Sequence, residues 1–232
     1  VEHCILKLNH QGKSPKADEV TRHQTVLDAS PPEFVSKYVP ELVFDRIEAK
    51  GAVAIFYRIA GQSLLKYLPL SSFGQQSQLK AIFTETNAVL LSKWNRGPSF
   101  TQVDHPCAVL KRWLGFRLDA GRPIEDFLEH TARVSPDIPG FLINGAVFPN
   151  PLRYARSPEP WGRTRPMDIA TGMIHGDLNT NNILVKFTEN SQSIEGYYLI
   201  DFALFKQDLP LLYDQRYLEM SYLMLALSQV PF

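Results

Sequence analysis

The N-terminal part of the chain alternates between short apolar runs and one amphipathic segment. Residues 1–8 form an apolar run of strand length, and residues 17–29 place their apolar side chains on one face of a helix. Two further strand-like runs, 41–49 and 52–59, follow a pair of prolines that ends this helix. The pattern predicts the order strand, helix, strand, strand.

The remainder of the chain is mostly helical in pattern. Helices are predicted at about 76–94 and 105–134, the second interrupted near the glycine and proline of residues 121–123. Prolines recur through residues 135–165, so we expect a long irregular insertion there, either a binding loop or a passive surface excursion. Strands followed by helices predict the α+β class.

Polar side chains interrupt apolar strands in two segments near the C-terminus. Residues 173–185 are Met-Ile-His-Gly-Asp-Leu-Asn-Thr-Asn-Asn-Ile-Leu-Val, and residues 198–203 are Tyr-Leu-Ile-Asp-Phe-Ala. The strands on either side of the polar residues 189–195 have the pattern of a hairpin. Such a hairpin brings Asn182 close to Asp201.

These residue types suit phosphoryl transfer. A carboxylate and an amide carbonyl, here Asp201 and Asn182, are oxygen ligands of the kind that Mg²⁺ prefers. Asp177 precedes Asn182 on the same loop, where its carboxylate can accept a proton from an attacking hydroxyl or orient it. Because the transition state is highly charged, a metal ion and correct positioning provide most of the catalysis.

The sequence His-Gly-Asp-Leu-x-x-x-Asn followed by Ile-Asp-Phe resembles the catalytic and metal-binding loops of the protein-kinase-like superfamily. The glycine after the histidine makes it most similar to the aminoglycoside phosphotransferase and choline kinase branch. The resemblance implies that Asp177 is the catalytic base, that Asn182 and Asp201 bind Mg²⁺, and that His175 is structural. Ala203 replaces the usual glycine of the second motif, which bears on the mobility of that loop.

A purely structural alternative exists for each residue. Asp177 and Asn179 are also common turn formers, and Asp201 is also a common helix cap. Two motifs at the expected separation favour the functional interpretation, because an accidental match of both is improbable.

The resemblance also implies a nucleotide-binding part upstream. Lys7 lies where these enzymes place the strand lysine that holds the α- and β-phosphates, and Glu19 is the first candidate for its helix partner. Asp18 and Glu33 are alternative partners, and a solvent-facing lysine is the alternative for Lys7.

Two other segments carry weaker parts of the resemblance. Residues 52–61 resemble the strand and hinge whose backbone binds adenine. Asp214, before the helical run 215–227, resembles the aspartate that braces the catalytic loop, although a helix N-cap is an equal reading.

The implied fold has two lobes. We expect a small antiparallel-sheet N-terminal lobe over residues 1–61, truncated at its start, and a helical catalytic lobe over residues 62–232 with the proline-rich insertion at about 135–166. The glycine-rich loop expected before the lysine strand is not in the chain, so we expect a longer polypeptide. The stretch 174–227 also resembles a kinase-like module of larger bacterial proteins, the ternary-complex-associated type.

Composition narrows the function classes. The 24 basic and 24 acidic residues balance, which argues against a nucleic-acid partner or a charged membrane surface. Cys4 and Cys107 have no metal-ligand or redox spacing, so a reducing, cytoplasmic location is expected. No apolar run is long enough to cross a bilayer.

The expected function is an ATP- and Mg²⁺-dependent transfer of a phosphoryl group to a hydroxyl. The short interval between Asp201 and Asp214 leaves little room for an activation loop, so the expected acceptor is a small molecule. The alternatives are a pseudokinase-like module that binds nucleotide without turnover, and a transferase of nucleotidyl groups. Arginines before the motif are a weak indication of an anionic substrate, or simply lie on a solvated loop: Arg153, Arg156, Arg163 and Arg165.

Overall fold

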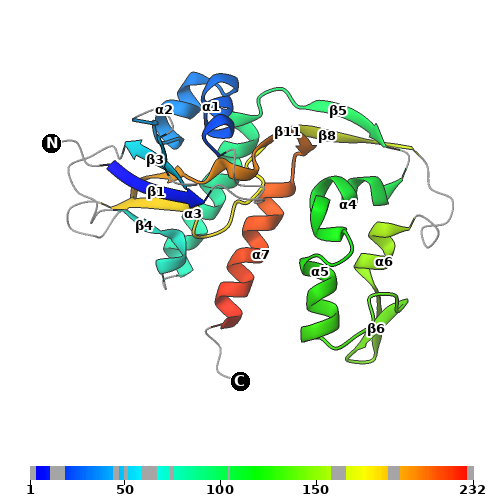
Figure 1. Ribbon diagram of the computed structural model, residues 1–232. Helices are drawn as coiled ribbons and strands as arrows, with labels where there is room; N and C mark the ends of the chain where they lie inside the picture. Colours follow the sequence, from blue (N-terminus) through cyan, green and yellow to red (C-terminus); the bar gives the residue numbers. More distant parts are fainter. Residues whose placement is uncertain are drawn as a thin grey trace. The chain divides into compact units, whose positions relative to one another are not determined.

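The computed structural model is a mixed α and β structure with small antiparallel sheets (Figure 1). It describes residues 4–10, 19–43, 47–49, 52–58, 67–73, 76–103, 105–157, 166–187 and 194–228. Contacts divide the chain into two compact units. Unit 1 comprises residues 1–97, 173–207 and 211–232, and unit 2 comprises residues 98–172 and 208–210. The predicted lobe boundary at residue 61 lies outside the described residues.

The first sheet of unit 1 confirms the predicted order of elements. Its antiparallel strands lie in the order β1 (Cys4–His10), β3 (Ala52–Arg58) and β2 (Ile47–Ala49). Alternate β3 side chains, Val53, Ile55 and Tyr57, are buried against Val20 of α1. This period of two is what a strand with one buried face requires. Of the strand predicted over residues 41–49, β2 covers Ile47–Ala49 and Leu42 makes an isolated bridge to Tyr57, while residues 44–46 lie outside the described part.

Two helices follow β1, of which one was predicted. Helix α1 (Glu19–Ala29) ends before the two prolines, as expected. A second helix, α2 (Pro32–Tyr38), begins at the second proline, and no pattern in the sequence had indicated it. Proline suits the first position of a helix because its fixed φ is helical and no N–H is needed there.

The second sheet of unit 1 contains the predicted hairpin. Its strands lie in the order β10 (Ile194–Leu199), β9 (Ile183–Phe187) and β4 (Tyr67–Pro69), all antiparallel. The described part of this unit also contains helical elements: the 3₁₀ turn Leu70–Ser72, α3 (Gln76–Val89) with its π-helical extension Leu90–Trp94, the 3₁₀ turn Phe202–Leu204 and α7 (Tyr213–Ser228). The helix predicted at about 76–94 is thereby confirmed.

An aromatic cluster forms the centre of unit 1. Phe34 of α2 stacks on Trp94 with ring centroids 4.9 Å apart. The ring of Phe202, from the second motif, contacts Trp94, His23 of α1 and His175 of the first motif. Trp94, Phe34 and Phe202 are among the largest fully buried side chains. The motif segments are therefore anchored in the core of the unit.

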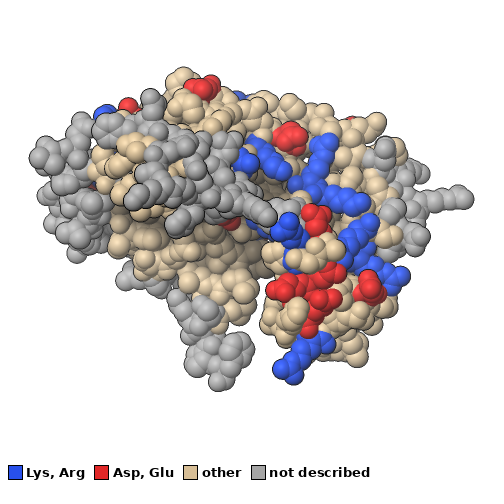
Figure 2. All heavy atoms as spheres, in the orientation of Figure 1, with Lys and Arg blue, Asp and Glu red and all other residues tan. Residues whose placement is uncertain are grey.

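Unit 2 contains the predicted interrupted helix. Its elements are α4 (Pro106–Leu114), the 3₁₀ turn Gly115–Leu118, α5 (Pro123–Asp126) and the π-helical turn Phe127–Thr131. Strands β5 (Ser99–Val103), β8 (Met167–Ile174) and β11 (Lys206–Pro210) form a sheet in the order β11, β8, β5. Figure 2 shows basic and acidic side chains interspersed over α4 and α5, so this face has mixed charge.

The prediction of an irregular insertion at 135–165 was wrong for its central part. Strands β6 (Gly140–Ile143) and β7 (Ala146–Pro149) form a hairpin, and α6 (Pro151–Arg156) follows. Asn144 and Gly145 have positive φ angles, as a tight hairpin turn requires. Pro149 ends β7 and Pro151 begins α6, so neither proline interrupts its element. Residues 158–165, with Arg163 and Arg165, lie outside the described part.

Asn150 holds this segment together. Its fully buried side chain accepts a hydrogen bond from the Leu152 N–H at 3.0 Å and so caps α6. The amide nitrogen donates to the carbonyl oxygens of Pro136 at 2.6 Å and Ile138 at 3.0 Å. One side chain thus connects the start of α6 to the chain that precedes the hairpin.

We expect Asn150→Ala to lower the free energy of unfolding by about 3 kcal/mol, because a helix cap is lost and two buried carbonyl groups lose a donor. Urea unfolding of both proteins measures the change. Asn144→Gly is the control, since glycine also adopts the positive φ of the turn, and should change the stability by less than about 0.5 kcal/mol. Equal effects of the two substitutions would contradict the assigned role of Asn150.

None of the helices in the described part of the chain is long and apolar enough to span a membrane.

Candidate functional site

The loop after β8 depends on a glycine. Gly176 has a φ of +83°, and a Cβ at this position would lie 2.2 Å from the backbone oxygen of Leu204. A side chain at this position is excluded by both the backbone conformation and the space. The glycine of the first motif therefore allows the loop to pass closely over the segment that follows Asp201.

Asp214 braces this loop from α7. Its buried carboxylate accepts hydrogen bonds from the backbone N–H groups of His175 at 2.7 Å and Gly176 at 3.0 Å. Burial raises the pKa of Asp214 to about 7, the nearby Asp177 adds to the rise, and the two hydrogen bonds oppose it. The geometry is that of the bracing aspartate and not only of a helix cap.

His175 connects the two motif segments. Its Nε2 lies 2.8 Å from the backbone oxygen of Ile200, and the Asp177 N–H approaches its Nδ1 at 3.4 Å. Since a carbonyl oxygen only accepts, Nε2 carries the proton in this arrangement. The imidazole also contacts the Phe202 ring at 4.7 Å. Its contacts are structural, as the sequence analysis expected.

Asp177 and Asn182 are joined through the backbone. The Asn182 side-chain nitrogen donates to the Asp177 carbonyl oxygen at 2.7 Å, which fixes the orientation of the amide. The Ile200 N–H donates to the Asn182 carbonyl at 3.0 Å and ties the loop to the strand that leads to Asp201. Asp201 itself has a left-handed backbone, with φ of +65°.

Tyr217 is a site residue that the sequence analysis missed. Its hydroxyl donates to Oδ1 of Asp177 at 3.0 Å. Tyr217 lies on α7, three residues after Asp214, so the same helix face reaches both the loop backbone and the Asp177 carboxylate. That spacing is the signal which could have identified it.

Lys7 lies between two carboxylates. Its ammonium is 2.8 Å from Oε1 of Glu19 and 3.0 Å from Oδ1 of Asp201. The Tyr57 hydroxyl donates to the same Glu19 oxygen at 2.6 Å. Burial and the Glu19 charge raise the pKa of Tyr57 well above its usual range, so this phenol remains a donor. One cation thus connects β1, α1 and the second motif.

Glu19 is a partner of Lys7, as predicted, and Glu33 pairs elsewhere. The Glu19 side chain is only 1% exposed, whereas Lys7 is 29% exposed. Glu33 forms an ion pair with Arg96 instead, and Asp18 lies outside the described residues. Lys7 is therefore held by a buried carboxylate while part of its side chain stays accessible.

A pocket of about 250 Å³ in unit 1 adjoins these groups. Three of the predicted residues, Lys7, Asn182 and Asp201, line it together. The rest of its wall is mainly apolar and aromatic: Leu6, Pro40, Tyr57, Arg58, Tyr67, Leu184, Tyr198 and Ile200. Burial raises the pKa of Tyr67 to about 12, so its hydroxyl is neutral at ordinary pH. We call this cavity the lysine pocket.

The lysine pocket offers few protein ligands for a metal. In the described part of the chain, no group of three or more His, Cys, Asp and Glu side chains could hold a metal ion. Asp201 and Asn182 contribute one carboxylate and one amide. A donor set of this size fits Mg²⁺ bound together with a nucleotide, because Mg²⁺ usually takes one or two protein ligands and completes its shell with phosphate oxygens and water.

Comparison with known proteins gives one match. The family model described as ternary complex associated domain 9 matches residues 101–229, more than half of the chain. The matched range includes Asp177, Asn182 and Asp201, whereas Lys7 and Glu19 precede it. No curated protein and no solved structure matches the chain.

Asp214 should make stability depend on pH. An unfolded aspartate releases its proton near pH 4, whereas the folded pKa is about 7. Between these values the folded chain binds more protons than the unfolded chain, so this group's contribution to stability falls as the pH rises. Asp214→Asn removes that contribution together with a hydrogen-bond acceptor.

We therefore expect the stability advantage of the wild type over Asp214→Asn to be larger at roughly pH 5 than at roughly pH 8. Urea unfolding of both proteins at the two pH values measures it, and other titrating groups, such as His23, cancel in the difference. An advantage that is equal at both pH values would show that Asp214 titrates normally.

Proposed function

The chain belongs to the ternary complex associated domain 9 family, and we propose that it is an ATP- and Mg²⁺-dependent phosphotransferase with a two-lobed, kinase-like arrangement. The proposed reaction transfers the γ-phosphoryl group of ATP to a hydroxyl of a small molecule. The observation that carries the proposal is the position of Lys7, which pairs with both Glu19 and Asp201 on the wall of a pocket that Asn182 also lines.

Lys7 is suited to hold phosphate groups. Its pairing with the buried Glu19 carboxylate fixes the direction of a side chain that would otherwise be flexible. The ammonium is a compact point charge of the kind that binds phosphate oxygens. In phosphotransferases of the kinase type, a strand lysine and a helix glutamate have this arrangement, and both members are required for turnover.

Asn182 and Asp201 are the residues that would hold Mg²⁺. The metal supplies charge neutralisation for the phosphates when it is bound. The hydrogen bond from the Asn182 amide nitrogen to the Asp177 carbonyl orients the amide oxygen away from that carbonyl. The left-handed backbone at Asp201 directs its carboxylate to Lys7, and hence to the place proposed for the phosphates.

The apolar and aromatic lining of the lysine pocket suits a nucleobase. Leu6, Leu184 and Ile200 provide aliphatic contacts, and Tyr67 and Tyr198 provide aromatic ones. A pocket with mostly apolar walls and a few polar groups is the usual form of a small-molecule site. A base held against these side chains would share the pocket with Lys7, which would hold the phosphates.

Asp177 would act on the acceptor hydroxyl. Its carboxylate lies on the same loop as Asn182, and Tyr217 fixes one of its oxygens. A carboxylate in this position can orient the hydroxyl and accept its proton as the new oxygen–phosphorus bond forms. The acceptor hydroxyl would thus be bound at Asp177, which does not line the lysine pocket.

Asp177→Ala should reduce γ-phosphate transfer about 10²- to 10⁴-fold, the usual contribution of a general base. Release of ADP from ATP and Mg²⁺ in the presence of candidate hydroxyl compounds measures turnover, and circular dichroism checks the fold. Asn181→Ala is the control, because Asn181 is an exposed residue of the same loop whose amide pairs with Ser71. Unchanged turnover in Asp177→Ala would contradict the assignment of Asp177 as the general base.

A binding module without turnover is the alternative, and the substitution of Ala203 for a motif glycine favours it. The same experiment separates the two functions. ATP binding without ADP above background, in the complete polypeptide, would favour the binding module. Label transferred from the α-phosphate to the acceptor would instead indicate nucleotidyl transfer.

Tyr217→Phe should lower kcat about three- to tenfold and leave the KM for ATP unchanged, because one hydrogen bond to the Asp177 carboxylate is lost and the lysine pocket is not altered. Steady-state kinetics at saturating acceptor separate the two parameters. Tyr222→Phe on the same helix is the control, since Tyr222 packs against Phe83. A change confined to the KM for ATP would refute this role of Tyr217.

A further inference from the structure

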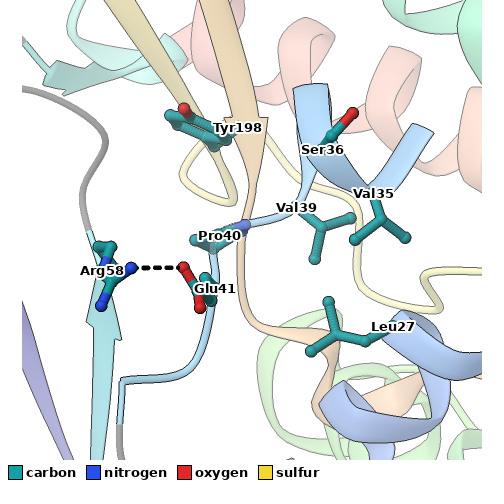
Figure 3. Close-up of a pocket in the computed structure, with 8 residues that line it drawn as sticks. All are labelled: Leu27, Val35, Ser36, Val39, Pro40, Glu41, Arg58 and Tyr198. Carbon is teal, nitrogen blue, oxygen red and sulfur yellow. Dashed lines mark hydrogen bonds and ion pairs between the residues drawn. The ribbon is translucent and has the colours of Figure 1, made fainter. Parts of the chain in front are cut away.

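A second pocket, of about 380 Å³, lies beside the lysine pocket within unit 1 (Figure 3). Its lining comes from α1, α2, the segment after α2, β3 and β10: Leu27, Val35, Ser36, Val39, Pro40, Glu41, Arg58 and Tyr198. Lys7, Asn182 and Asp201 are not part of it. The proposed phosphotransfer therefore makes no use of this cavity, which we call the arginine pocket. Its volume is within the range of small-molecule sites.

The arginine pocket has an apolar side and a charged side. Leu27, Val35 and Val39 lie together on one side in Figure 3, and the pair of Arg58 and Glu41 lies on the other. The Arg58 guanidinium is 2.9 Å from Oε2 of Glu41. Such a lining fits a ligand with an apolar body and one charged end.

The exposure of the two paired side chains decides whether the charged end of the ligand is an anion or a cation. The Glu41 side chain is 63% exposed and Arg58 is 42% exposed, so Glu41 can return to water at lower cost. The Glu41 carboxylate already occupies the position that a ligand carboxylate would take on Arg58. We propose that the arginine pocket binds a small amphiphilic carboxylate, whose charged end replaces Glu41 on Arg58 and whose apolar body contacts Leu27, Val35 and Val39.

The arginine pocket shares a wall with the lysine pocket, so binding in one can affect the other. Pro40, Arg58 and Tyr198 line both pockets, so they form a common wall. The Pro40 carbonyl oxygen also lies 2.9 Å from Nε2 of His23 on α1, the helix that carries Glu19. A ligand that moves this wall changes the shape of the lysine pocket. Occupancy of one pocket then alters the affinity of the other, and the change is equal in both directions.

The test of the site uses octanoate as probe and isothermal titration calorimetry on the full chain, without nucleotide. Ser36→Trp places a large side chain from the exposed rim into the cavity and should weaken octanoate at least about tenfold by steric exclusion. Lys37→Trp is the matched control, since Lys37 is the next residue of α2 and does not line the pocket. Equal octanoate affinities of Ser36→Trp and Lys37→Trp would overturn the site.

Glu41→Gln tests the contact between Arg58 and the ligand carboxylate. Whereas Ser36→Trp should weaken octanoate binding, Glu41→Gln should strengthen it. Octanoate should bind this variant about three- to tenfold more tightly, because the Glu41 carboxylate no longer competes for Arg58. Octan-1-ol should bind the wild type and the variant equally. Weaker octanoate binding by Glu41→Gln, or a preference of the wild type for octylammonium, would overturn the carboxylate assignment.

The coupling between pockets rests on the proposed function and has its own measurement. Saturating octanoate should change the Kd of ATP and Mg²⁺ for the wild type, and Ser36→Trp should abolish that change. An unchanged Kd for ATP would overturn the coupling and leave the site intact. A chain that binds octanoate as described and binds no ATP would contradict the proposed function alone.

Discussion

The placement of one cation between two carboxylates organises the candidate site. Glu19 is almost completely buried, and a buried carboxylate is tolerated only when it is paired and hydrogen-bonded. Lys7 and Tyr57 provide those partners, from β1 and β3 of the first sheet. The ammonium of Lys7 also contacts Asp201. The cation that the buried Glu19 carboxylate of α1 requires therefore also fixes the position of the second motif.

Packing supports the same arrangement from below. Phe202 follows Asp201 directly and is fully buried against His23 of α1 and His175 of the first motif. Displacing Asp201 would therefore require moving a large aromatic side chain out of a close-packed core, which is costly. The position of the carboxylate is fixed by its charge partner on one side and by its neighbour in sequence on the other.

The sequence predicted what local patterns encode, and it missed what depends on distant contacts. Strand alternation gave β1 and β3, and the motif gave Asp177, because these signals lie in neighbouring residues. The role of Tyr217 depends on how α7 packs against the loop, so its spacing of three residues from Asp214 is only a weak signal in the sequence. The prolines of residues 135–165 predict irregular structure, yet residues 140–149 form a hairpin, because proline at a strand end or at the first position of a helix is compatible with both elements.

The residues of the candidate site come from two separate parts of the chain, and the C-terminal part depends on the N-terminal part. The family match covers the motif residues and begins after Lys7 and Glu19, yet the Asp201 carboxylate contacts Lys7 at 3.0 Å. Removing the N-terminal strand and helix would leave the half-buried Asp201 without this cation, and would uncover Phe202 and Tyr57. A carboxylate that is mostly buried is costly without a partner, so Lys7 stabilises the position of Asp201. In the proposed reaction, Asp201 would hold Mg²⁺ and Lys7 would hold the phosphates, while the buried Glu19 keeps the Lys7 ammonium in place.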